Sequence, residues 1–213
     1  MKSLNSIKSG KATRHDPLWD HSFWTVQTDF DDAFNETLLD ELYSVAQEIS
    51  TSANPKTSLW DYPRPNLQIL KSAFDACVYS ATQSVPELKN LKLKFHCDMA
   101  WPNIRQPGMG IEAHAHPDTS YALTYYVKTP PNCGDLICYL ENGEIKRITP
   151  TSGLIAILPF YMIHEIEINR SSDLRVSISA DYFQIVDPDA PNALVLKSWC
   201  ADMLKVREWN SAS

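Results

Sequence analysis

Residues 91–96 read LKLKFH, and they mark the change of pattern on which the fold depends. Apolar and polar residues alternate in this stretch, and a repeat of two residues is the period of a β-strand with one buried face. Before it, apolar residues recur at helical spacing, which predicts helices over residues 35–49 and 67–84. The chain therefore changes from helices to strands near residue 91.

Several short strands are predicted after this point, each bounded by turn residues. Asn142-Gly143, between two of them, is a strong hairpin signal because both residues tolerate positive φ. Helices followed by strands predict an α+β domain with a double-stranded β-helix (jelly-roll, cupin-like) core, backed by the N-terminal helices. The predicted strands are residues 121–127, 135–140, 145–148, 153–158, 163–168 and 174–186.

The length of 213 residues fits one domain, residues 1–213. A hydrophobic content of 44% with 21% charged residues allows a sizeable core. Four parts are expected within the domain. They are a loosely ordered arm (1–20), a helical support (21–90), the jelly-roll core (91–186) and a C-terminal extension (187–213) that could form a closing helix or a homodimer contact.

Composition excludes several classes of protein. A formal net charge of −7 argues against sequence-independent binding of nucleic acid, which needs clustered Lys and Arg. Five cysteines without CxxC spacing argue against a disulfide framework or a zinc ribbon. No secretory signal and no membrane-spanning stretch is visible. The expected compartment is the reducing cytoplasm.

Three histidines carry most of the chemical information. His114 and His116 stand two residues apart, so on an extended segment their side chains point the same way, and His164 can approach from another strand. Three ligands on one side of a metal leave the opposite positions open, and Fe(II) suits such a site. Arg175, eleven residues after His164, would supply a fork for a dicarboxylate co-substrate.

Two sets of metal ligands are consistent with the sequence. One is His114, His116 and His164; the other is His116, Asp118 and His164, with a carboxylate in place of one imidazole. The two sets differ by one unit of ligand charge. Pro117 favours the first set because proline often marks the end of a strand. The sequence leaves both sets open.

Residues 174–182 read LRVSISADY, in which Arg175, Ser177, Ser179 and Asp181 share one face of a strand. The simplest explanation is a surface strand with its polar side in water. In a jelly roll with helices packed outside, the apolar face would instead meet the helices and the polar face would line the interior.

These motifs together resemble the Fe(II)/2-oxoglutarate-dependent oxygenase superfamily, and within it small oxygenases with a His-x-His-Pro motif that are related to prolyl hydroxylases. The resemblance covers about residues 91–185. The matching residues are Trp101, Asn103, Gly108, His114, His116, Pro117, Tyr125, Tyr126, Gly134, Leu136, Pro159, His164, Arg175 and Ser177.

The resemblance implies an enzyme that binds Fe(II) and the co-substrate 2-oxoglutarate, with no catalytic residue beyond the metal ligands. Arg175 and Ser177 would anchor the distal carboxylate of 2-oxoglutarate, and the hydroxyl of Tyr126 would contact it as well. Trp101 and Asn103 would form a wall of the substrate pocket. Substrate choice is expected from the loops at residues 51–66 and 102–110 and from residues 161–162.

The reaction implied is hydroxylation of an unactivated C–H bond of an amino acid, peptide or small metabolite by O2, with release of succinate and CO2. Two other classes of protein remain open. One is a cupin-type metal enzyme that does not use 2-oxoglutarate. The other is a non-catalytic jelly-roll binding protein in which the histidines are structural.

Overall fold

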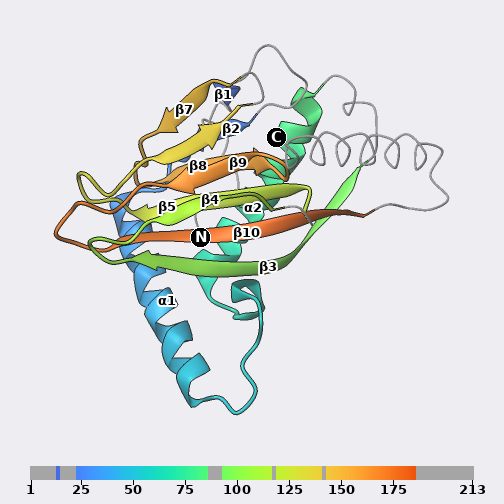
Figure 1. Cartoon of the computed structure of the whole chain (residues 1–213). Coiled ribbons are helices and arrows are strands. Elements are labelled where there is room, and N and C mark those ends of the chain that lie inside the picture. The colour runs from blue at the N-terminus through green and yellow to red at the C-terminus, as the bar shows by residue number, and fades with distance from the viewer. Residues whose placement is uncertain (1–12, 15–22, 86–92, 117–118, 141–142, 186–213) are drawn as a thin grey trace.

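The structure is a computed structural model that describes residues 13–14, 23–85, 93–116, 119–140 and 143–185 (Figure 1). Most of the predicted arm (1–20), the extension (187–213), Asp118 and Asn142 lie outside the described residues. In chain order the elements are β1 (Thr13–Arg14), β2 (Trp24–Gln27), α1 (Asp32–Thr51), η2 (Leu59–Asp61), α2 (Pro65–Ser84), β3 (Lys94–Arg105), β4 (Ile111–His114), β5 (Tyr121–Lys128), β6 (Leu136–Tyr139), β7 (Ile145–Ile148), β8 (Leu154–Pro159), β9 (Ile163–Ile166) and β10 (Arg175–Ile185).

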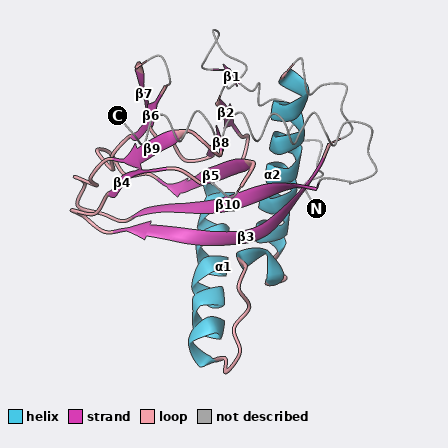
Figure 2. Cartoon of the chain, turned by 45° about the vertical axis from the view of Figure 1, so that its right-hand side comes forward, coloured by secondary structure: helices cyan, strands magenta, loops and turns pink. Residues whose placement is uncertain are grey.

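The strands form two antiparallel sheets. The large sheet has the order β1-β2-β8-β5-β10-β3, and the small sheet has the order β4-β9-β6-β7. Figure 2 shows the strands on one side and both helices on the other. The helices precede strands β3 to β10, which is the α+β arrangement that the sequence predicts. Strands β1 and β2 were not predicted: they come before the helices, in the segments expected to be the arm and the helical support, and they join the large sheet.

Local interactions explain where both helices begin. The side chain of Asp31 caps α1 by accepting a hydrogen bond of 2.9 Å from the backbone N–H of Phe34. Helix α2 begins with Pro65 and has no side-chain cap of its own. The carboxylate of Glu41, from α1, accepts from the first free N–H groups of α2 instead, those of Asn66 and Leu67, at 2.9 Å each. This contact also fixes how the two helices pack together.

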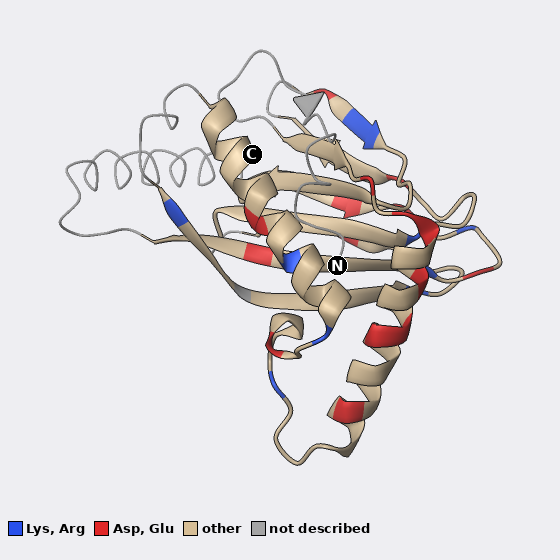
Figure 3. Cartoon of the chain, turned by 180° about the vertical axis from the view of Figure 1, so that it is seen from behind, with Lys and Arg blue, Asp and Glu red and all other residues tan. Residues whose placement is uncertain are grey.

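The helices cover the outer face of the large sheet. Figure 3, seen from behind, shows α1 and α2 in front of the strands, with acidic residues along α1. Apolar side chains of the helices and of the sheet form one hydrophobic cluster between them. Its strand members include Val176, Ile178 and Ala180, the apolar face of β10. The polar face of β10 therefore points away from the helices, toward the small sheet.

A second, smaller cluster lies between the two sheets. It contains Phe23, Tyr126, Leu136, Cys138, Leu140, Ile148, Ala156, Leu158 and Met162. These side chains fill one part of the space between the sheets. In the described part of the chain, the four cysteines are free thiols, and neither long helix has the length and hydrophobicity that crossing a membrane requires.

The structure differs from the sequence prediction at residues 102–110, which were expected to be a loop. Strand β3 continues through Pro102 as far as Arg105 and pairs with β10 along its whole length. Proline is tolerated because β3 is at the edge of the large sheet, where one side of the strand needs no hydrogen-bonding partner. The consequence is that Arg105 lies on a strand, in the same sheet as Arg175.

Candidate metal centre

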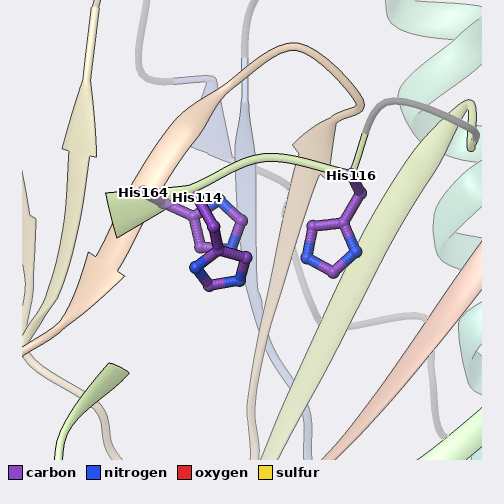
Figure 4. A group of neighbouring side chains, drawn as sticks. All are labelled: His114, His116 and His164. Atoms are coloured by element: carbon purple, nitrogen blue, oxygen red, sulfur yellow. The ribbon is translucent and has the colours of Figure 1, made fainter. Parts of the chain in front are cut away.

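The three predicted histidines come together at one end of the space between the sheets. His114 ends β4 and pairs directly with His164 of β9, while His116 lies in the segment that follows β4 (Figure 4). The centroid of the His164 ring is 4.4 Å from that of His114 and 5.3 Å from that of His116. One possible ligand atom from each ring lies within 4.8 Å of the other two. The set fits a single metal ion.

His116 was expected on the same extended strand as His114, but β4 ends at His114. The backbone N–H of His116 donates to the carbonyl oxygen of Phe160 at 3.1 Å, and its carbonyl accepts from the N–H of Thr119 at 3.1 Å. These bonds fix the position of the His116 backbone. The ring of His116 therefore still faces the other two.

Hydrogen bonds set which ring nitrogen can bind a metal. The Nδ1 of His164 lies 2.9 Å from the carbonyl oxygen of Met162, and that of His114 lies 2.8 Å from the carbonyl oxygen of Glu112. A carbonyl oxygen only accepts, so Nδ1 carries the proton in both rings. Nε2 then keeps its lone pair and is free to act as a ligand.

Burial also favours the ligand form of His164. The side chain is 7% exposed, and this burial lowers its pKa to about 4, although the contact with the carbonyl of Met162 raises it and the two neighbouring imidazoles lower it further. His164 is thus neutral near pH 7, which is the state that binds metal.

One pocket connects the histidines with both arginines of the interior. Its described lining consists of Trp101, Asn103, Arg105, Ile111, His114, His116, Ala122, Leu123, Thr124, Leu136, Leu158, His164, Ile166, Arg175, Ser177 and Ser179. The described lining includes no acidic side chain. The pocket is therefore a place for an anion within a chain whose net charge is −7.

Arg175 is the most notable polar residue of this pocket because it is 1% exposed. Its Nη1 donates to the carbonyl oxygen of Gly134 at 3.1 Å, and its Cζ lies 5.1 Å from the centroid of the Tyr126 ring. Its Nε and Nη2 have no hydrogen-bond partner among the described residues. Burying a cation whose donors lack partners costs free energy, unless an anion binds and accepts hydrogen bonds from them.

The other predicted site residues occupy different positions around this arginine. Ser177 is buried on the pocket wall. Trp101 and Asn103 also line the pocket, and Nδ2 of Asn103 donates to Oγ of Ser179 at 2.9 Å. Tyr126 is fully buried against Arg175, and its hydroxyl has no hydrogen-bond partner among the described residues. Burial raises the pKa of Tyr126 to about 12, so the hydroxyl keeps its proton and remains a donor.

Two residues of this region were not singled out from the sequence. Arg105 lines the pocket beside Arg175. Asp181 places Oδ1 3.1 Å from Nδ1 of His116. The alternation in residues 174–182 places Asp181 on the same face as Arg175 and Ser177, but it does not indicate the contact with His116. No comparable signal marked Arg105, since Pro102 made its segment resemble a loop.

No protein-family model matches the sequence, and no curated protein matches it. Solved structures do match. The prolyl 4-hydroxylase of Pseudomonas putida is similar at 15% sequence identity, with a TM-score of 0.57 and coverage of 80% of this chain and 97% of that chain. The fold is that of the 2-oxoglutarate/Fe(II) oxygenases.

Other solved structures support the same fold. The viral collagen prolyl hydroxylase of Paramecium Bursaria Chlorella virus-1, solved as a 2OG complex, has a TM-score of 0.55 at 13% identity, with 77% of this chain and 96% of that chain covered. The carbocyclase SnoK from nogalamycin biosynthesis has a TM-score of 0.61 at 9% identity, with 88% and 94% covered. The predicted double-stranded β-helix is confirmed, and so is the resemblance to these oxygenases at the level of the fold.

Proposed function

We propose that the chain is an Fe(II)- and 2-oxoglutarate-dependent dioxygenase that hydroxylates an unactivated C–H bond of an amino acid, a peptide or a small metabolite. One observation carries this proposal. A single pocket holds three converging histidines and, beside Ser177, the buried guanidinium of Arg175, whose Nε and Nη2 have no partner in the described part of the chain. A dicarboxylate that reaches from a metal to an arginine matches both features.

The donor set suits Fe(II). His114, His116 and His164 would hold the ion through neutral imidazoles and would leave coordination positions open for the co-substrate and O2. With both bound, the metal supplies the oxidising chemistry, in which one oxygen atom of O2 enters the product hydroxyl and the other enters succinate as CO2 leaves. His114, His116 and His164 hold the ion, and the protein's remaining work is positioning and exclusion of water.

Arg175 orients the co-substrate in this proposal. Its Nε and Nη2, which lack a partner among the residues that the structure describes, form the fork that a carboxylate accepts in two parallel hydrogen bonds. Ser177 lines the same pocket and can add a further hydrogen bond. Tyr126 lies opposite Ser177 on β5, and we propose that its hydroxyl also reaches the carboxylate. The stacked ring of Tyr126 also holds the guanidinium in place from one side.

Trp101 and Asn103 form the wall of the pocket on the edge strand, and we propose that they contact the prime substrate. Solved structures with this fold include a prolyl hydroxylase bound to a peptide fragment from Trichoplax adhaerens and the epimerase SnoN from nogalamycin biosynthesis. A peptide or a small molecule is therefore the class of substrate to test first.

The test is succinate formation by the protein loaded anaerobically with Fe(II), measured across a panel of amino acids, peptides and small metabolites. We expect succinate only when Fe(II), 2-oxoglutarate and O2 are all present. His164→Ala should lose both metal and succinate formation, and His96→Ala, outside the histidine cluster, is the control. Turnover without 2-oxoglutarate would favour a cupin-type metal enzyme instead. Absence of bound iron after reconstitution would favour a non-catalytic binding protein.

A further inference from the structure

Arg105 and Arg175 are direct neighbours on adjacent strands. Arg105 of β3 pairs with Arg175 of β10 in the antiparallel ladder, and both side chains line the pocket that contains the histidines. Side chains directly opposite in such a ladder have Cβ atoms only about 4.5 to 5.5 Å apart. Two guanidinium groups therefore share one end of the pocket.

Neither arginine has a carboxylate partner among the described residues. The ion pairs of other basic side chains, such as Lys128 with Asp173 and Arg147 with Glu167, lie elsewhere. The Nε of Arg105 is buried without a hydrogen-bond partner, like the Nε and Nη2 of Arg175. Burial and the charge of Arg175 both lower the pKa of Arg105. Like charges on neighbouring side chains repel each other, and an anion bound between them would offset this repulsion.

The backbone holds both arginines in this arrangement. Asn169 is 1% exposed, and its Nδ2 donates to the carbonyl oxygens of Arg105 at 3.0 Å and Asp173 at 2.9 Å. One buried amide thus connects the end of β3 with the segment that leads into β10. The pairing of Arg105 and Arg175 is a fixed feature of the fold, and side-chain motion alone cannot separate the two strands.

We propose that Arg105 is a second binding residue for the distal carboxylate of 2-oxoglutarate, acting with Arg175 from the neighbouring strand, and that the pair makes the site selective for a keto acid with a negative charge at that end. A carboxylate has two oxygens with four lone-pair directions, so it can accept from both guanidinium groups. The inference rests on the proposed function, because it names a residue that acts on the same co-substrate.

A comparison of two ligands tests this role without measuring turnover. 2-Oxoglutarate and 2-oxopentanoate share the keto-acid end, but 2-oxopentanoate has a methyl group where 2-oxoglutarate has its distal carboxylate. Their dissociation constants are measured by calorimetry on the anaerobic Fe(II)-loaded protein, for the wild type, for Arg105→Gln and for Arg105→Lys. Arg170→Gln, which removes an exposed arginine outside the described pocket lining, is the matched control.

We expect Arg105→Gln to weaken 2-oxoglutarate binding roughly tenfold to a hundredfold, the loss typical of one charge-assisted hydrogen bond. Binding of 2-oxopentanoate should not change, Arg105→Lys should restore part of the loss, and Arg170→Gln should have no effect. The ligand-free Arg105→Gln protein should melt at the same temperature as the wild type or higher, because one of two repelling charges is gone.

Three outcomes would overturn the inference. Unchanged 2-oxoglutarate affinity in Arg105→Gln would mean that Arg105 serves another anion, such as a charged group of the prime substrate. An equal loss for both ligands would mean that Arg105 supports the pocket as a whole and does not bind the distal carboxylate. A wild-type protein that binds iron but no 2-oxoglutarate would contradict the proposed function itself. The binding measurement on the wild type shows this before any variant is tested.

Discussion

The Nδ1 atom of His116 lies 3.1 Å from Oδ1 of Asp181, and this contact joins the segment after β4 to a strand of the large sheet. His116 follows β4 of the small sheet, and Asp181 belongs to β10 of the large sheet. A carboxylate beside a ligating histidine orients the ring and increases its basicity. In the proposed metal site, this carboxylate would offset part of the positive charge that three neutral imidazoles leave on the ion.

Asp181→Asn should therefore weaken metal binding roughly tenfold to a hundredfold while the fold is retained. Competition with a chelator of known affinity measures this directly. Asp173→Asn is the control, since Asp173 is an exposed carboxylate paired with Lys128. Equal metal affinity in Asp181→Asn and wild type would show that the carboxylate does not support His116.

The two sets of ligands that the sequence leaves open make opposite predictions for one pair of variants. His114 is in direct register with His164 and has its Nδ1 occupied by the carbonyl of Glu112, so we expect His114→Ala to lose iron and Asp118→Ala to keep it. Metal content per chain after reconstitution and desalting is the measurement. Iron retained in His114→Ala and lost in Asp118→Ala would establish Asp118 as the ligand.

The stability of the metal-free protein should fall as the pH is lowered from about 6.5 to about 4, partly through His164. In that window the unfolded chain binds a proton at this residue and the folded chain does not, so the free energy of unfolding rises with pH. The full effect is about 3 kcal/mol. Urea unfolding at a series of pH values, compared between wild type and His164→Asn, measures the contribution of His164 to this pH dependence. The same pH dependence in both proteins would contradict the assignment.

Gly134→Ala should destabilise the fold more than Gly143→Ala, although both glycines have nearly the same positive φ, +88° and +82°. The backbone strain of alanine is about 1 to 2 kcal/mol at either position. Only at Gly134 would the new Cβ collide with the backbone carbonyl of Glu167. Denaturant unfolding of the two variants gives the comparison. An equal loss of unfolding free energy in both would mean that the loop at Gly134 can move away from the added methyl group at little cost.

A second effect should accompany Gly134→Ala. The carbonyl of Gly134 accepts from Arg175, so a shifted loop should also weaken 2-oxoglutarate binding. Gly143→Ala should leave that binding unchanged, because the space around Gly143 is open.

Periodicity predicted the elements that depend on local pattern. The helix predicted over residues 35–49 is α1, and the one predicted over residues 67–84 is α2, each with slightly different ends. The alternation in β10 alone left two explanations open, a surface strand and a strand whose polar face lines the interior. The second is confirmed, because the apolar side chains of β10 pack in the cluster with the helices.

The sequence could not predict pairings between distant segments. Arg105 and Arg175 are seventy residues apart in number, and only the register of β3 on β10 makes them neighbours. The contact between His116 and Asp181 likewise depends on how the two sheets face each other. The prediction of a loop from Pro102 onward was wrong, because β3 lies at the edge of the sheet, where a proline does not interrupt the strand.

The two faces of the large sheet have different roles: its outer side chains pack on the helices, and its inner side chains line the pocket. Successive side chains on a strand point to opposite faces, so substitutions at inward positions leave the helix packing intact. New specificities could therefore be evolved or engineered on this scaffold at little risk to folding. A library confined to Trp101, Asn103 and Thr124 would explore different substrates while the hydrophobic layer beneath stays as it is.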